Sequence, residues 1–348
     1  RRANRGLWKL RGKAHYSRML QFGWPIRTAM WTRRAWPRDT FPDVIWAISS
    51  SNLMGVFAGR YLSKIYQRPF VMELHDPPLY PDDAGPPSVV RRGFSRCVRQ
   101  SAAIVTTTHS YARYLSQAYK LPDEHVVPIY LSYRGDIQTP LPKRATDRFV
   151  FLHAGSLTTS RGKNARTLLE ALAVLFKKRP SCQPHIRLRL LGGGEGTAEF
   201  RTLAAQLHVS DALECLDEVP REQFRAELDA ADVLLVIKYV EQKYDMQIPG
   251  KLFEYLGTGK PILGLMRRTT EGAEILQRSG LGTVPEFGQV EALSQSMLEL
   301  WDNRERLHAV YRADQDYVRQ FSSDAMVDRV DLLLNRLAAK SDALDGGR

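Results

Sequence analysis

The sequence predicts an α/β protein with two domains, each organised around a parallel β-sheet. At 348 residues, the chain is long enough for two separate hydrophobic cores. Short apolar segments alternate with helical stretches, which is the pattern of parallel strands joined by crossover helices. The alternation occurs on each side of residues 138–147, a segment with two prolines and mixed polarity that we interpret as the domain linker.

The predicted strands are short apolar segments bounded by turn or polar residues. Those before the linker are Val44–Ala47, Phe70–Leu74, Ala103–Thr107 and Val126–Ile129. Those after it are Phe149–His153, Ile186–Leu191, Leu213–Leu216, Val233–Ile237, Ile262–Leu265 and Leu281–Val284. The clearest helices are expected at residues 7–20, from Leu53 to Tyr66, from about Arg166 to Lys178, and in the region from Val290 to Leu337.

Positive charge is concentrated in the first part of the chain. Residues 1–145 carry 23 Lys/Arg and 9 Asp/Glu, although the whole chain has a net charge of +12. The first 38 residues hold 11 basic residues, no acidic residue and four of the six tryptophans. Arginine interleaved with tryptophan favours contact with an anionic membrane surface. The alternatives are a basic connector that covers the sheet and a nucleic-acid contact, but no nucleic-acid-binding motif is present, so no nucleic acid is expected as a partner.

Cysteine spacing and hydropathy indicate the compartment in which the protein is expected. Cys97, Cys182 and Cys215 are far apart and form neither a metal-binding spacing nor a disulfide framework. A reducing, cytoplasmic compartment is therefore expected, with peripheral contact to the cytoplasmic face of a membrane. No signal-peptide pattern and no apolar run of about 18 residues is found, so no transmembrane segment is predicted.

The most informative motif is IPGKLFEYLGTGKPILGL, residues 248–265. Pro249 and Gly250 suit the first turn of a helix, and Lys251 and Glu254 are spaced to face the same side of it. Helix-terminal amides and a lysine bind diphosphate well, and a carboxylate binds ribose hydroxyls. The motif therefore indicates a sugar-nucleotide site. The simpler alternative is an ordinary βαβ unit in which Lys251 and Glu254 are solvated.

Over this stretch the chain resembles the retaining glycosyltransferases of family 4, in which a segment P-x-K-x-x-E-Y-x-x-x-G-x-P-I builds the donor site. The resemblance implies the GT-B fold: two Rossmann-like domains that face a cleft. It implies that a nucleoside-diphosphate sugar binds the second domain and an acceptor the first. It also implies transfer without a metal or a protein nucleophile, so no cofactor is expected.

The resemblance also implies domain boundaries. We expect a basic Trp-bearing segment at 1–39, an acceptor domain at 40–140 and a donor domain at 141–320. A helix at 321–340 is expected to pack back on the first domain, followed by a disordered tail at 341–348. Relatives open with an apolar strand and a glycine-rich turn, whereas this chain opens with RRANRGLWKL. The N-terminal domain is therefore expected to be truncated, either in a fragment or by loss of these elements.

Donor-binding residues are assigned by the resemblance to Ile248, Pro249, Gly250, Lys251 and Glu254. The family pairs the glutamate matched by Glu254 with another one eight residues earlier, and that position is Met246 here. Asp245 and Glu241 are the nearby alternatives for this role.

A second donor segment is AGSLTTSRGKNARTLLEAL, residues 154–172, which matches the family's strand–loop–helix for the diphosphate. Gly155, Ser156, Arg161 and Lys163 are its candidate residues, with Ser156 at a position that is usually arginine. Cations here would stabilise the leaving diphosphate. A solvated basic loop is the alternative.

His75, in ELHDPP, follows a predicted strand at the edge where open α/β sheets bind ligands. The matching family histidine lies near the donor sugar, so His75 and Glu254 are the catalytic candidates; a structural hydrogen-bonding role for His75 is the alternative. The glycines of LLGGGEGT, residues 190–197, are predicted to form a tight strand-to-helix turn.

These observations predict a retaining glycosyltransferase that moves a sugar to an acceptor hydroxyl. The expected role is cell-surface polysaccharide or glycolipid synthesis, with a lipid-linked or glycan acceptor. The alternatives are a non-catalytic GT-B protein that binds a nucleotide or a partner, and a sugar-nucleotide epimerase.

Overall fold

The computed structural model describes residues 23–49, 53–78, 88–138, 148–155, 159–194 and 196–345. The helix predicted at 7–20, most of the predicted linker and Ser156 lie outside these ranges. The chain forms two compact units, which are described separately. The first comprises the residues up to Tyr130 together with those from Val327 onward, and the second comprises Leu131–Met326.

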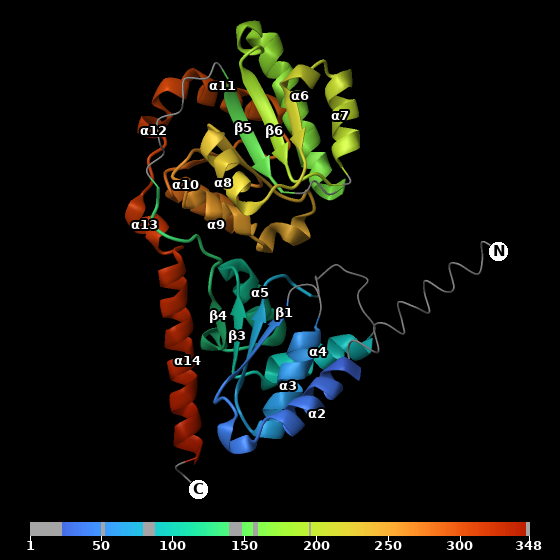
Figure 1. Ribbon diagram of the computed structural model, residues 1–348, viewed down its shortest axis with the longest axis vertical. Helices are drawn as coiled ribbons and strands as arrows, with labels where there is room; N and C mark the ends of the chain where they lie inside the picture. Colours follow the sequence, from blue (N-terminus) through green and yellow to red (C-terminus); the bar gives the residue numbers. More distant parts are fainter. Residues whose placement is uncertain are drawn as a thin grey trace, which may run out of the picture. The chain divides into compact units, whose positions relative to one another are not determined.

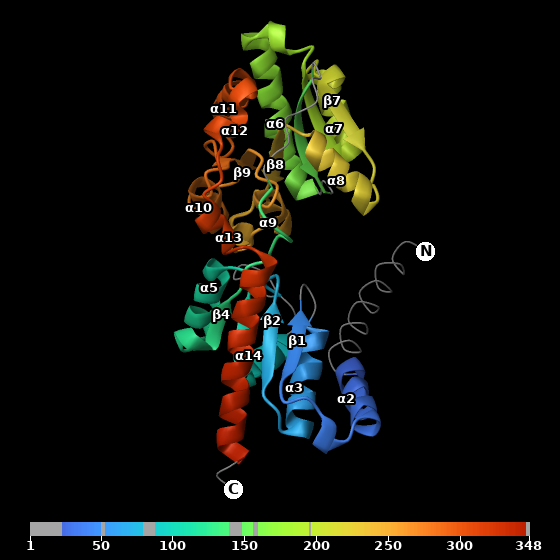
Figure 2. The same cartoon turned by 60° about the vertical axis from the view of Figure 1, so that its left-hand side comes forward.

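The first unit contains a four-stranded parallel sheet in the order β1-β2-β3-β4 (Figure 1). Its strands are Ile45–Ser49, Phe70–Leu74, Ala103–Thr106 and Val126–Pro128. Its helices are α2 (Trp24–Ala35), α3 (Met54–Tyr66), α4 (Ser88–Gln100) and α5 (His109–Tyr119), and most of α14 (Ser323–Asp345) belongs to the same unit. Helix α2 lies beside α3 in both views (Figures 1 and 2).

Helix α3 packs closely on the first strands because it carries a glycine at the contact. A Cβ atom added at Gly59 would lie 2.6 Å from Cβ of Ala47 on β1. This approach allows Val56 and Phe57 of α3 to be buried. Helix α3 therefore covers one face of the first sheet, which is the face toward which the buried residues of β1 point.

The second unit contains a six-stranded parallel sheet in the order β10-β9-β8-β5-β6-β7. In chain order its strands are Phe149–Ala154, Ile186–Leu191, Leu213–Leu216, Val233–Ile237, Ile262–Leu265 and Gly282–Thr283. Its helices are α6 (Thr159–Lys178), α7 (Thr197–Gln206), α8 (Arg221–Ala230), α9 (Gly250–Leu256), α10 (Glu271–Arg278), α11 (Val290–Asp302), α12 (Leu307–Val310) and α13 (Gln315–Arg319).

The strand order reverses at β5, which pairs with β6 on one side and with β8 on the other. Later strands are added outward from this point in both directions. In open α/β sheets, ligands bind beyond the carboxyl ends of the strands at such a reversal. The end of β5 is therefore where the second unit is expected to hold a ligand.

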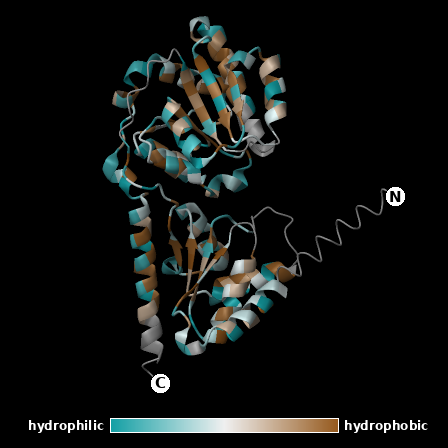
Figure 3. Cartoon of the chain, in the orientation of Figure 1, coloured by the Kyte–Doolittle hydropathy of each residue, from teal (hydrophilic) through white to brown (hydrophobic). Residues whose placement is uncertain are grey.

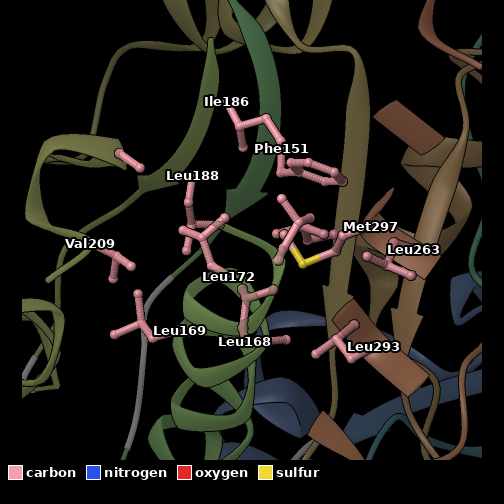
Figure 4. Close-up of a cluster of buried hydrophobic side chains, with 14 of the residues drawn as sticks. Phe151, Leu168, Leu169, Leu172, Ile186, Leu188, Val209, Leu263, Leu293 and Met297 are labelled. Carbon is pink, nitrogen blue, oxygen red and sulfur yellow. The ribbon is translucent and has the colours of Figure 1, made fainter. Parts of the chain in front are cut away.

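The core of the second unit lies between its sheet and helices α6 and α11. Figure 4 shows Leu168 and Leu172 of α6, Phe151 of β5 and Met297 of α11 in one cluster. All four side chains are fully buried. In Figure 3 the strands of both sheets are predominantly hydrophobic, whereas the helices carry mixed faces, as burial of parallel strands requires.

The predicted α/β class and strand order along the chain are confirmed. Several strands, including Phe70–Leu74, Ile186–Leu191 and Val233–Ile237, have the predicted bounds. The last one is shorter than predicted, Gly282–Thr283, because only these two residues pair with β9. The helix expected from about Arg166 begins earlier, at Thr159.

The boundary between the two units lies before residues 131–138, whereas the predicted linker at 138–147 placed it after them. This segment is bonded to the second unit: the N–H of Tyr133 donates to the carbonyl of Phe321 at 3.1 Å, and that of Gln138 to the carbonyl of Gly257 at 3.0 Å. Residue 341 was expected to begin a disordered tail, but α14 continues to Asp345. Ala343 and Leu344 favour helix, and the first glycine pair comes only after them.

Within the described ranges, no helix combines the length and the apolar character that a membrane span requires.

Replacement of Leu172 by alanine tests the core of the second unit. Because Leu172 is fully buried in the cluster of Figure 4, we expect a loss of about 2–5 kcal/mol in the free energy of unfolding. Urea unfolding followed by circular dichroism measures it. Leu332→Ala is the matched control, because the Leu332 side chain is 73% exposed and should change stability by less than about 0.5 kcal/mol. Equal effects of the two substitutions would contradict this assignment of the core.

Candidate functional site

Two glycine turns meet at the strand-order reversal of the second unit. Strand β5 ends at Ala154, and the following Gly155 has φ +133°, a conformation that side chains disfavour. The N–H of Gly155 donates to the carbonyl of Leu191 at the end of β6, at 2.6 Å. Gly192, with φ +118°, packs on the backbone of Gly155, and a Cβ added to Gly192 would lie 3.2 Å from it. The glycine-rich segment after β6 thus serves the tight turn predicted for it.

Lys251 on α9 reaches the end of β5. Its ammonium Nζ donates a hydrogen bond to the carbonyl of Ala154. A Cβ atom at Gly155 would lie only 2.1 Å from Nζ, so any side chain there would displace the lysine. The structure therefore brings two predicted donor residues, Gly155 and Lys251, into contact. Together they place a positive charge beside an open backbone turn, an arrangement suited to an anion.

The rest of α9 anchors the helix in the sheet. Phe253, Tyr255 and Leu256 are fully buried. The hydroxyl of Tyr255 accepts a hydrogen bond from the N–H of Ala154 at 3.2 Å. Burial raises the pKa of Tyr255 well above its ordinary value, so this group is neutral and serves the structure. One face of α9 is thus fixed, and Lys251 and Glu254 lie outside it.

Glu254 is exposed and makes no hydrogen bond or ion pair with any described residue. Ile248 is 6% exposed and lies near Gly272, so only its backbone is open to a ligand. Pro249 is the N-cap of α9, and Gly250 has Leu131 against it, 3.2 Å from a hypothetical Cβ. Of these donor candidates, Lys251 and Glu254 have functional side chains that can meet a ligand.

The carboxylate nearest to the position of Met246 is already engaged. Asp245 lies in the short 3₁₀ turn η6 (Gln242–Met246), and its Oδ1 is 2.8 Å from Nη1 of Arg267. Arg267 also donates to the carbonyl of Val240 and lies over the ring of Phe287. This ion pair holds the turn that leads into α9. Of the two predicted alternatives, Glu241 is exposed and Asp245 is committed to Arg267.

Lys238 was not among the predicted site residues, yet its hydrogen bonds fix the same turn. It follows β8 and is only 3% exposed. Its Nζ donates to the carbonyl of Tyr244 at 2.7 Å and also to the carbonyl of Gln247. A buried ammonium group requires such partners. The signal in the sequence is a lysine placed directly after the apolar strand VLLVI, which is an unusual position for a solvated charge.

The basic pair Arg161 and Lys163 lies in the first turns of α6, because this helix begins at Thr159. The interpretation of these residues as part of a loop is corrected: threonine and serine at residues 158–160 favour a helix start at this point. The side chains of both residues, and all of Ser156, lie outside the description of the structure.

In the first unit, His75 directly follows β2 and is bonded to a carboxylate on that strand. Its Nε2 lies 2.5 Å from Oε1 of Glu73, and the indole N–H of Trp46 on β1 donates to Oε2 of the same group. Burial acts to raise the pKa of Glu73, but the bonds to His75 and Trp46 outweigh it and lower the pKa. The bond to Glu73 raises the pKa of His75 against the opposing effect of burial.

Glu73 and Trp46 were not among the predicted site residues. The alternation of a strand places Glu73 and His75 on one face, which the sequence could have indicated. Among the residues that the structure describes, no group of three or more His, Cys, Asp or Glu is arranged to hold a metal ion.

The fold and this site define a class of protein. Residues 136–316, which include the α9 site, match the family described as "Glycosyl transferases group 1". The chain belongs to this family, and its two parallel-sheet units have the GT-B fold of the structures that it resembles.

Solved structures support the fold over most of the chain. The Anabaena protein Alr3699/HepE, in complex with UDP, is 17% identical with a TM-score of 0.69, and the match covers 90% of this chain and 82% of that protein. A glycosyltransferase from Rickettsia africae is 13% identical with a TM-score of 0.66 and coverages of 90% and 80%. Sucrose-phosphate synthase from Thermosynechococcus elongatus is 15% identical with a TM-score of 0.65 and coverages of 86% and 74%. No curated protein matches the sequence.

Gly155→Ala tests the contact between β5 and α9. The added Cβ cannot coexist with Nζ of Lys251, and the φ of +133° adds strain. We expect the affinity for inorganic pyrophosphate as an anion probe, measured by isothermal titration calorimetry, to fall at least about tenfold, because a displaced charge-assisted donor is worth about 1.5–3 kcal/mol. Gly288→Ala is the control for backbone strain, since Gly288 also has positive φ but has no atom within 4 Å of its hypothetical Cβ. Equal affinities of the two variants would contradict the assignment.

Proposed function

We propose that this protein transfers a sugar from a nucleoside-diphosphate sugar to an acceptor hydroxyl, with retention of configuration. The observation that carries the proposal is the contact of Lys251 with the Ala154–Gly155 turn, at the strand-order reversal of the second unit. Glu254 follows on the same helix, exposed and uncommitted to any described residue. A cation for the diphosphate and a carboxylate for the ribose are thus three residues apart.

The leaving group is a nucleoside diphosphate, which gains negative charge as the glycosidic bond breaks. Lys251 stabilises that charge, and Arg161 and Lys163, in the first turns of α6, add to it. Fixed positive charge aimed at a leaving group is among the larger contributions to enzyme catalysis. In this proposal the leaving phosphate assists removal of the acceptor proton, so the protein needs neither a nucleophile nor a metal. His75 stays a predicted site residue of the first unit.

A uridine nucleotide is the donor best supported by the comparisons. The Anabaena protein was solved with UDP, with UDP and glucose, and with UDP-glucose. The fold is shared, and the lysine and glutamate of α9 are the groups that would hold the diphosphate and ribose of such a donor. We therefore propose a hexose carried by UDP as the first substrate to test.

The acceptor is proposed to be a lipid-linked or glycan hydroxyl, used in cell-surface polysaccharide or glycolipid synthesis at the cytoplasmic face of a membrane. Helix α2 supports contact with an anionic bilayer. Trp24, Met30 and Trp31 are 47%, 53% and 69% exposed, although they are large and apolar. Arg27 and Arg34 are exposed on the same helix, which has no acidic residue. Indoles and guanidinium groups together suit the lipid headgroup region.

A non-catalytic GT-B protein that binds a nucleotide is the second candidate. The observation that favours it is Met246, which stands where the family has the first glutamate of its pair, and the only adjacent carboxylate, that of Asp245, is bonded to Arg267. Nucleotide binding without transfer to any acceptor would support this candidate over the first.

Thermal unfolding in the presence of UDP, GDP and ADP tests the donor site. A ligand at about 100 times its dissociation constant adds about 2.7 kcal/mol, which raises the unfolding midpoint by a few degrees. We expect a shift with UDP that Glu254→Ala diminishes. The control is Glu291→Ala, which removes an exposed glutamate from α11. A protein that responds to none of the three nucleotides would contradict the donor assignment.

Flotation with phosphatidylglycerol vesicles tests the membrane contact of α2. Arg27→Gln should weaken binding about fivefold, because each basic residue near the surface contributes about 1 kcal/mol. Trp31→Ala should also weaken it through loss of an exposed indole. Leu332→Ala, at an exposed apolar position on α14, should have no effect. Binding that persists undiminished in the double variant of Arg27 and Trp31 would place the contact elsewhere.

A further inference from the structure

The second unit contains a hollow that the proposed donor site does not use. It is lined by residues of helices α6 and α11, by the last residue of β9 and by the loop that follows β10, and its volume is about 260 Å³. Ligand pockets for drug-sized molecules typically measure about 300–1,000 Å³. The hollow is slightly smaller, so it suits one small ring rather than a whole nucleotide.

The hollow and the α9 site lie on opposite faces of the second sheet. Leu265 at the end of β9 belongs to the core cluster formed with α6 and α11. The preceding residue, Gly264, faces the other way, because a Cβ atom added to it would lie 2.8 Å from Leu276 of α10. Helix α10 in turn packs beside α9: a Cβ added at Gly272 would lie 3.7 Å from Leu252. The hollow is therefore distinct from the α9 site.

The floor of the hollow is apolar, and an aromatic ring forms part of its wall. Leu265 and Leu293 are buried and line it together with Pro285. The ring of Phe287 also lines it and carries the guanidinium group of Arg267 at 4.8 Å from its centroid. An aromatic face attracts the slightly positive C–H groups of a saturated ring. The hollow can thus receive a ring whose contact face is made of C–H groups.

The loop that carries Phe287 is held in shape by its own bonds and by neighbouring groups. The N–H of Gln289 donates to the carbonyl of Glu286 at 3.2 Å, which closes a tight turn with Phe287 at its second position. Arg267, which lies over the Phe287 ring, is paired with Asp245 at 2.8 Å. A wall that is fixed in advance loses little conformational freedom when a ligand binds.

Three polar side chains of the hollow are available to a ligand: the carboxylate of Glu286, the amide of Gln289 and the hydroxyl of Thr167. Within the described ranges, none of these three side chains forms a hydrogen bond or an ion pair with another residue. The carboxylate accepts hydrogen bonds, whereas the amide and the hydroxyl both donate and accept. Sugar hydroxyls also donate and accept, so they match all three groups.

We propose that this hollow is a carbohydrate-binding site that holds one neutral sugar residue. The C–H face of the sugar packs on Phe287, and its hydroxyls bond to Glu286 and Gln289. The charge of Glu286 selects against a phosphorylated or otherwise anionic sugar. The inference goes beyond the proposed function, because the site requires neither a nucleotide nor sugar transfer. It gives the second unit a contact with a sugar that is separate from the donor site.

Saturation-transfer NMR with the full chain tests the proposal. The probes are the methyl glycosides of glucose, galactose and mannose, with excess UDP present. We expect transfer to the C–H protons of at least one glycoside. Glu286→Gln should weaken its binding about tenfold, because a hydrogen bond to a charged group is lost. Phe287→Leu keeps the apolar bulk but removes the aromatic face, so it should weaken binding about fivefold.

Glu291→Gln is the matched control, because Glu291 is an exposed glutamate in the first turn of α11 and does not line the hollow. It should bind the glycoside as the wild type does. The proposal is overturned if no glycoside receives transfer, or if Glu286→Gln binds the sugar as tightly as Glu291→Gln.

Two further probes examine other occupants of the hollow. Glucose 1-phosphate should bind more weakly than the neutral glycoside, and tighter binding that Glu286→Gln leaves unchanged would contradict the proposed role of the carboxylate. Uridine, tested without UDP, should show no transfer that depends on Phe287. Transfer to the uracil ring that Phe287→Leu removes would assign the hollow to a nucleoside and overturn the proposal.

The failure of the proposed function is recognised separately, because these measurements need neither transfer nor a bound nucleotide. The affinity for pyrophosphate reports on the turn beside Lys251 and should be unchanged in Glu286→Gln. A protein that binds the glycoside through Glu286 but binds neither pyrophosphate nor UDP would refute the donor assignment and support this site. A protein that binds UDP but no glycoside would do the reverse.

Discussion

The candidate site of the second unit depends on how closely α9 approaches the end of β5. Two contacts make this approach: the N–H of Ala154 donates to Tyr255, and the carbonyl of Ala154 accepts from Lys251. One peptide segment is therefore held by two side chains of the same helix. The next residue must be glycine, because no Cβ fits beside the ammonium group. The position of the positive charge is thus determined by the packing of the sheet and not by a flexible loop.

The turn before α9 is fixed by two cations of the second unit. Lys238 is buried and donates to the carbonyl of Tyr244 in η6, and Arg267 pairs with Asp245 of the same turn. In the family, the equivalent turn contributes a glutamate to the donor site. Here Met246 occupies that position, and the acidic residue of the turn, Asp245, forms an ion pair with Arg267.

The first unit carries its polar cluster on the parallel pair β1 and β2. The cluster differs from the second site in kind, since its central group is a carboxylate that accepts from the indole of Trp46 and is bonded to His75. Although burial acts to raise it, the bonds to His75 and Trp46 lower the pKa of Glu73, and the bond to Glu73 raises the pKa of His75. The exposed apolar and basic side chains of α2 belong to the same unit.

The sequence by itself determined the α/β class, nearly all strand positions and the start of a helix at residues 249–250. These features are local: runs of β-branched and apolar residues form strands, and proline and glycine place the helix. Tertiary structure alone decided which polar groups pair. Arg267 is 22 residues from Asp245, and Trp46 is 27 residues from Glu73. Such partners are chosen by strand order and register, which bring distant residues to one edge of a sheet and which no local pattern encodes.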